Sequence, residues 1–171
     1  MNKNSSKSFQ SNGFYHFAIT KRDRSNYISM TTSVSNFSAR IEGQFVKTNN
    51  KNSMWGLNFW HVSNHDESYL HYHRFAISEK CEYALQVFDQ NYGWENLRDW
   101  QYSPLIVKGG INRLEINVWN KEIHLAVNGK DLFIGHLTYQ ESGYVGFTVA
   151  TDRQTKYAEV RFRNFLVKEV R

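Results

Sequence analysis

The sequence predicts an all-β fold, a two-sheet antiparallel β-sandwich of the jelly-roll type. Residues that favour strands (Val, Ile, Thr, Tyr, Phe and Trp) number 56 of 171, whereas Ala and Leu together number 17. Short β-like runs follow one another with turn residues between them. No convincing helix interrupts these runs. The pattern therefore excludes a helical bundle and a βαβ fold.

The chain begins with a polar segment, residues 1–12, which we expect to be a flexible lead before a single sandwich domain over residues 13–171. The lead lacks the apolar stretch of a signal peptide, and no apolar run reaches the length of a transmembrane helix, so no compartment is assigned. The expected strands cover residues 14–20, 26–32, 37–47, 54–61, 68–77, 81–89, 105–107, 112–119, 122–127, 131–137, 143–150 and 156–168.

Two hairpin turns set the expected register of residues 112–137. Asn128-Gly129 suits a type I′ turn, in which both central residues have positive φ, and Asn120-Lys121 suits a second two-residue turn. This register places eight apolar residues on one face, as a buried sheet face requires: Leu114, Ile116, Val118, Ile123, Leu125, Val127, Leu132 and Ile134.

Residues 54–89 form a further pair of expected hairpins, with a loop at 63–67 and a turn near Glu79. One face is apolar and is assigned to the core: Leu57, Phe59, Phe75, Ile77, Tyr83, Leu85 and Val87. The opposite face mixes aromatic rings with amide and guanidinium groups, which suits sugars, because their C–H faces stack on rings while their hydroxyls need hydrogen-bond partners. The candidate ligand-binding residues are Asn58, Trp60, Tyr72, Arg74 and Gln86, with Trp94 from a loop.

Six segments carry a family resemblance: WGLNF (55–59), YAL (83–85), NRLEI (112–116), IHLAVNG (123–129), GYVGF (143–147) and VRFRNF (160–165). In order and spacing they resemble the concanavalin A-like lectin/glucanase superfamily, in the branch of laminin-G-like bacterial modules. The resemblance implies a two-sheet sandwich whose concave sheet often faces a ligand. Its members include sugar-binding modules, glycoside hydrolases and protein-interaction modules. Such motifs specify architecture far more than chemistry.

Carboxylate spacing argues against catalysis. A glycosidase needs two carboxylates facing one sugar, and two on a single strand share a face when they are two or four residues apart. No two of the 16 acidic residues are two apart, and Glu95 and Asp99, four apart, fall in an expected loop or irregular strand. We therefore expect no enzyme, although a carboxylate pair drawn from different strands stays open.

Histidines supply the one candidate metal site. His71 and His73 share a strand face, and the predicted register makes His61 a diagonal neighbour of His71, so these three could ligate zinc. The alternative is a structural role near the rim of the core, with hydrogen bonds satisfying the ring nitrogens. We favour the structural role and expect no cofactor. Calcium occurs among laminin-G-like modules, but no acidic cluster assigns it here.

The sequence therefore predicts a non-catalytic binding module that binds a carbohydrate or glycoprotein through its concave sheet. The alternatives are a protein-interaction domain that contacts other domains of a larger polypeptide and a glycoside hydrolase. The net charge of +5 is spread among acidic residues, and no nucleic-acid-binding motif accompanies it. We expect neither nucleic-acid binding nor membrane insertion.

Overall fold

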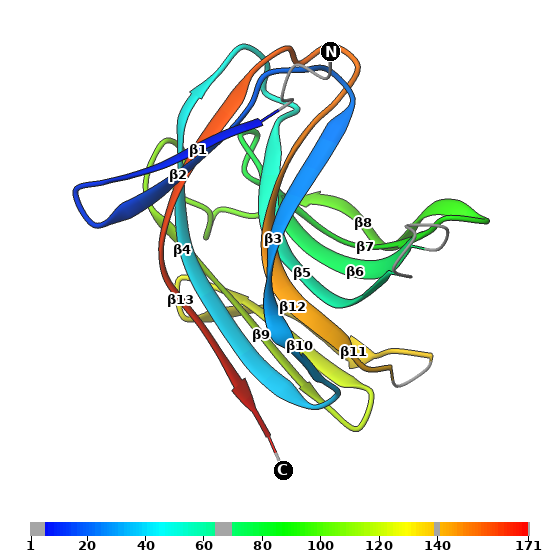
Figure 1. The fold of residues 1–171 in the computed structure, drawn as a ribbon. Coiled ribbons are helices and arrows are strands. Elements are labelled where there is room, and N and C mark those ends of the chain that lie inside the picture. The colour runs from blue at the N-terminus through cyan, green and yellow to red at the C-terminus, as the bar shows by residue number, and fades with distance from the viewer. Residues whose placement is uncertain (1–5, 64–69, 139–140, 171) are drawn as a thin grey trace.

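A computed structural model describes residues 6–63, 70–138 and 141–170 as two antiparallel sheets, seen as two layers in Figure 1. The seven-stranded sheet contains, in spatial order, β1 (Ser6–Ser11), β2 (Phe14–Ile19), β13 (Ala158–Glu169), β4 (Phe37–Thr48), β9 (Asn112–Trp119), β10 (Glu122–Val127) and β11 (Lys130–His136). The six-stranded sheet contains β3 (Arg24–Val34), β12 (Gly143–Thr151), β5 (Met54–Ser63), β6 (Leu70–Ser78), β7 (Glu82–Asp89) and β8 (Gly93–Tyr102). The predicted all-β sandwich is confirmed. The described part of the chain contains no helix long and apolar enough to cross a membrane.

The hydrophobic core lies between the two sheets, on the face that each turns toward the other. Leu57 and Phe75 enter it from the six-stranded sheet, and Ile41 and Leu114 enter it from the seven-stranded sheet, all four with no exposed surface. Each such side chain contributes about 1.5–3 kcal/mol by leaving water. Below, the inner face of the six-stranded sheet is the one toward this core, and its outer face is the one turned away.

Both predicted two-residue turns are confirmed, with positive φ at Asn120, Lys121, Asn128 and Gly129, as the type I′ turn predicted at Asn128-Gly129 requires. The predicted pairing of β9 with β10 is also confirmed, with Val127 opposite Leu114. Beyond the second turn a β-bulge between Leu125 and Ala126 shifts β11 by one residue. The expected burial of Ile134 is therefore wrong: a one-residue shift moves its side chain to the other face, where it is 54% exposed.

Two element assignments from the sequence need correction, and a third is decided between its alternatives. Residues 6–11 of the expected flexible lead form β1, an edge strand paired with β2 along its length. An edge strand that is exposed on both faces needs no apolar alternation, so its pattern gave no strand signal. Residues 94–100, expected as a loop or irregular strand, lie in the edge strand β8, whose pairing with β7 shifts register at two places, so the irregular strand is confirmed. Residues 105–107, expected as a strand, contain turns instead.

A loop at 63–67 predicts a register with Leu57 opposite His73, but β5 and β6 pair two residues away from it, with Leu57 opposite Phe75. A shift of two leaves each side chain on its predicted face. A β-bulge between Phe59 and Val62 then reverses the faces of the two residues within it, Trp60 and His61. The backbone of β12 approaches this bulge at Gly143, where a Cβ atom would lie 2.5 Å from the carbonyl carbon of Trp60. Only glycine fits there.

Candidate functional site

The outer face of the six-stranded sheet brings together five of the six predicted ligand-binding residues. Asn58, Arg74 and Gln86 lie side by side across β5, β6 and β7. Tyr72 and Trp94 lie in the next row, with their ring centroids 5.6 Å apart. The side chains of the sheet therefore converge where the alternation pattern placed them, and β8 supplies Trp94 in place of a loop.

The prediction places Trp60, the sixth candidate ligand-binding residue, on the wrong face of the sheet. The bulge turns its side chain into the core, where it has no exposed surface and packs edge-on against Phe59 at 5.6 Å. The indole Nε1 donates a hydrogen bond to the Ser35 carbonyl oxygen at 3.0 Å. Trp60 is thus a core residue and is out of reach of a ligand on the outer face.

An aromatic row crosses the outer face from β3 to β8 and consists of Tyr27, His61, Tyr72 and Trp94. Successive ring centroids lie 4.1, 5.7 and 5.6 Å apart. The two end rings are open to solvent, with Tyr27 39% and Trp94 45% exposed, whereas His61 and Tyr72 are buried. The row therefore offers ring surface at both ends, as stacking of sugar rings requires.

Arg74 lies beside the aromatic row with its guanidinium 4.0 Å from the centroid of the Trp94 ring. Its Nε and Nη2 donate hydrogen bonds to Gln86 Oε1 at 3.2 and 2.7 Å, and Gln86 Nε2 donates to Asn96 Oδ1 at 2.8 Å. Burial lowers the pKa of Arg74 to about 10, so the group stays positive at neutral pH. Within the described ranges no carboxylate forms an ion pair with it.

Asn58 and His61 leave four buried polar atoms on this face without a hydrogen-bond partner in the described structure: both side-chain atoms of the Asn58 amide and both ring nitrogens of His61. Each unsatisfied buried group costs about 1–3 kcal/mol unless a water or ligand bonds to it. Burial also lowers the pKa of His61, which favours its neutral form. Sequence reasoning missed His61 here because the predicted register turned it inward, and it placed Tyr27 on no face.

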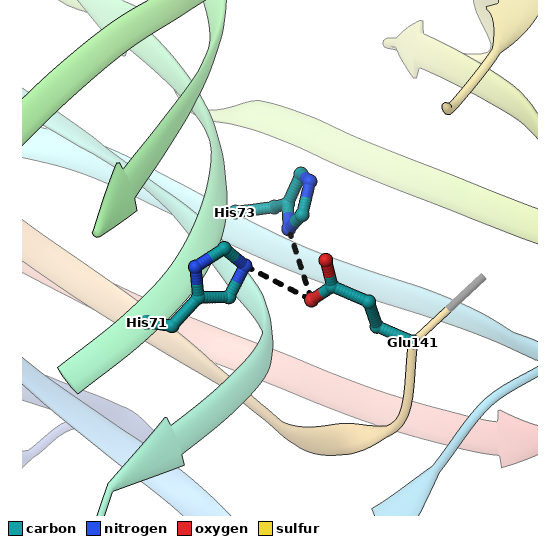
Figure 2. A group of neighbouring side chains, drawn as sticks. All are labelled: His71, His73 and Glu141. Carbon is teal, nitrogen blue, oxygen red and sulfur yellow. Dashed lines mark ion pairs between the residues drawn. The ribbon is translucent and has the colours of Figure 1, made fainter. Parts of the chain in front are cut away.

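A second cluster lies on the inner face, at a cavity of about 560 Å³. Figure 2 shows His71 and His73 of β6 with Glu141, which lies just before β12. His71 Nε2 is 2.9 Å and His73 Nδ1 is 4.0 Å from Glu141 Oε2. The sequence paired these histidines with His61, which the bulge carries to the opposite face. Glu141 is the third residue of the cluster instead of His61. The alternation of side chains along strands could not have predicted that Glu141 lies next to β6.

The environments of the two clustered histidines differ. His71 Nδ1 lies 3.3 Å from Asp89 Oδ2 and His71 Nε2 lies 2.9 Å from Glu141 Oε2, so one carboxylate lies beside each of its nitrogens. His73 is 6% exposed, and its Nδ1 has no hydrogen-bond partner among the described residues. Burial, with a smaller contribution from the charge of His71, lowers the pKa of His73 to about 3, so its ring is neutral at pH 7.

No family model matches the sequence, and no curated protein matches it. Solved structures do share the fold. Carbohydrate-binding module CBM66 from Bacillus subtilis aligns with a TM-score of 0.73 at 14% identity, over 96% of this chain and 92% of that one. A β-glucanase from Bacillus licheniformis aligns with a TM-score of 0.67 at 8% identity, over 99% and 84%. Sheep galectin-11 aligns with a TM-score of 0.54 at 13% identity, over 86% and 98%.

These likenesses confirm the predicted concanavalin A-like jelly roll, a fold that sugar-binding proteins use. At such identities they establish the fold alone, because one fold hosts many functions. Membership of the narrower laminin-G-like branch stays a prediction. Both a binding module and a hydrolase occur among these structures, so a function for this chain has to be argued from its own residues.

Proposed function

We propose that the protein is a non-catalytic carbohydrate-binding module that holds its ligand on the outer face of the six-stranded sheet. The observation that carries the proposal is the set of unsatisfied polar atoms of Asn58 and His61 beside a partly exposed aromatic row. A sugar can satisfy both features of this face. Its hydroxyls can donate to and accept from the unsatisfied polar atoms, and its C–H faces can cover the exposed aromatic rings.

Trp94 is the proposed stacking platform. Arg74 covers one face of its indole at 4.0 Å and fixes the ring, while 45% of the residue remains exposed. A ring held in this way loses little conformational entropy when a ligand stacks on it. Tyr27, at the other end of the row, offers a second contact surface for a ligand longer than one sugar unit.

The charge of Arg74 favours an acidic sugar. Its guanidinium is buried and has no carboxylate partner in the described ranges, and a buried charge is costly until it is paired. A uronic acid carries a carboxylate that can supply this pairing and hydroxyls that match the unsatisfied atoms of Asn58 and His61, which are 1% and 2% exposed and are reached only when neighbouring side chains move aside. We expect the module to prefer oligosaccharides that contain uronic acid over their neutral counterparts.

The outer-face site itself supports a binding role over catalysis. The residues of this site carry no carboxylate, whereas a glycosidase needs two, about 5–10 Å apart. They are Tyr27, Asn58, His61, Tyr72, Arg74, Gln86 and Trp94. Gln86 bonds to Asn96, and Asn96 donates a hydrogen bond to the Asp99 carboxylate at 2.9 Å, which links one acidic group to this set. One acidic group at the border of the site does not make an acid–base pair.

Titration with a panel of neutral and uronic acid oligosaccharides, followed by Trp fluorescence and calorimetry, tests the proposal. We expect Trp94→Ala to weaken binding about tenfold, because a stacked aromatic contact is worth about 1 kcal/mol or more. The matched control is Trp119→Ala on β9, since Trp119 is also 45% exposed but lies on the other sheet, and it should leave affinity unchanged. If no sugar binds, or if both variants bind equally, the proposal fails and a protein-interaction domain becomes the better interpretation.

A glycoside hydrolase is the second candidate, because three carboxylates, those of Asp89, Glu95 and Glu141, line the inner-face cavity. Reducing-end release from the same panel measures this directly. Release by the wild type that disappears in Glu95→Gln would favour the hydrolase. Binding without release favours the module.

A further inference from the structure

His71, His73 and Glu141 place three metal-ligating atoms around one point on the inner face. His71 and His73 are two residues apart on β6, so both rings project from the same face of the strand. Glu141 brings a carboxylate to them from a distant part of the chain (Figure 2). The two imidazole nitrogens and the carboxylate oxygen all lie within 4.8 Å of one another.

The spacing of these atoms is close to what a four-coordinate ion requires. Ligand atoms bound at about 2.0–2.1 Å in a tetrahedron are separated by about 3.3 Å. The observed separations from Glu141 Oε2 are 2.9 Å to His71 Nε2 and 4.0 Å to His73 Nδ1. Side-chain rotations of a few tenths of an ångström to about 1 Å would bring both to the required distance, and the Glu141 side chain, 29% exposed, borders open space on one side.

Neighbouring groups orient both imidazoles for this role. His71 Nδ1 lies 3.3 Å from Asp89 Oδ2, a hydrogen-bond acceptor, and this contact orients the ring so that Nε2 points toward Glu141. A carboxylate behind a ligating histidine is a recurring arrangement at zinc sites, where it fixes the tautomer and the ring orientation. The His73 ring is clamped between Phe59, stacked at 5.2 Å, and Trp60, edge-on at 5.4 Å. Its buried Nδ1 has no hydrogen-bond partner in the described ranges, so its lone pair is available to bind a metal ion.

We propose that His71, His73 and Glu141 form a binding site for a divalent transition-metal ion of the zinc class. Two nitrogens and one carboxylate oxygen are the donor set that zinc accepts with three protein ligands, leaving a fourth position open. That position faces the cavity of about 560 Å³, which has room for a water molecule or a ligand oxygen. The site is independent of the proposed sugar site, because it lies on the opposite face of the sheet.

Calorimetric titration of the untagged, chelator-treated chain of residues 1–171 with Zn²⁺ tests the proposal, with Co²⁺ absorption as a second readout. We expect one ion per chain and the intense visible bands of four-coordinate cobalt. Glu141→Gln and His71→Gln should each weaken zinc binding at least about tenfold. These two variants avoid the buried His73, so the fold should be kept, and thermal melting of each variant in the absence of metal checks this.

His124→Gln is the matched control, since His124 also contacts a carboxylate, that of Glu122, but stands apart from the cavity. Its zinc affinity should equal that of the wild type. Loss of affinity in the two site variants alone supports the proposal. Absence of stoichiometric binding, cobalt bands of six-coordinate intensity, or equal affinity in all four proteins would overturn it.

Discussion

Asn58→Leu tests the most unusual feature of the outer face, an amide that is 1% exposed and has no partner in the described structure. Leucine has the same number of side-chain heavy atoms as asparagine in the same branched arrangement and brings no polar atom, although its two methyl groups need more room than the amide. The substitution removes two unsatisfied groups, the Nδ2 donor and the Oδ1 acceptor. Since each such group costs about 1–3 kcal/mol when buried, we expect the free energy of unfolding to rise by about 1–3 kcal/mol even after some loss to imperfect packing.

Urea unfolding with linear extrapolation measures this change, and an unchanged m-value confirms that the fold and the denatured state are comparable. For a chain of this size each kcal/mol corresponds to about 2–4 °C in Tm. Asn112→Leu is the matched control. Asn112 is likewise buried, at 4% exposure, but its amide bonds to the backbone of Val107 in both directions, at 2.7 and 2.9 Å. Its replacement should therefore destabilise.

We thus expect the same chemical change to raise the free energy of unfolding at Asn58 and to lower it at Asn112. If Asn58→Leu destabilises as much as Asn112→Leu, the Asn58 amide is paired in the folded protein and the main support for the sugar site is lost. If Asn58→Leu stabilises the fold and also weakens sugar binding, the amide is held unsatisfied for a ligand. Such an exchange of stability for function is common at binding sites.

Two further predictions concern the bulge residues. Burial lowers the pKa of His61 below 6.5, so at acidic pH the unfolded chain takes up a proton that the folded chain does not, and stability falls as the pH drops below that value. Urea unfolding at several pH values gives the slope of the free energy of unfolding against pH, and His61→Phe should reduce this slope by up to about 1.4 kcal/mol per pH unit. An unchanged slope would show that His61 protonates freely in the folded protein. Trp60→Phe should lower the free energy of unfolding by about 1–3 kcal/mol, because it removes the bond to Ser35 and leaves a small cavity. Its sugar affinity should equal that of the wild type, and a large loss would mean that Trp60 contacts the ligand.

Turn chemistry explains why part of the fold could be predicted residue by residue. Asn128-Gly129 admits positive φ at both positions, and the structure has 53° and 77° there. A tight turn leaves one register, and that register then fixes which residues face the core. The same reasoning placed Asn58, Tyr72, Arg74 and Gln86 on one face. The face of a side chain depends only on whether its position along the strand is odd or even, so a register shift of two residues leaves it unchanged.

Contacts between distant segments were beyond this kind of reasoning. Glu141 joins His71 and His73 only because β12 lies beside β5, a pairing that brings together segments about 90 residues apart. The order of strands in a sheet depends on how the whole core packs, and no local pattern encodes it. The histidines could thus be singled out as candidate ligands from their spacing, whereas their carboxylate partner required the structure.

The bulge at Trp60 and His61 determines the chemistry of both faces of the six-stranded sheet. A bulky residue with a φ of 49° is strained, and alternation along β5 gives no sign of it. The strain is offset because the bulge buries a whole indole, bonds it to Ser35 and packs it against Phe59. The same local twist sends His61 outward, into the gap between Tyr27 and Tyr72. The unsatisfied imidazole of the proposed sugar site therefore follows from the packing of the core on the other side of the sheet.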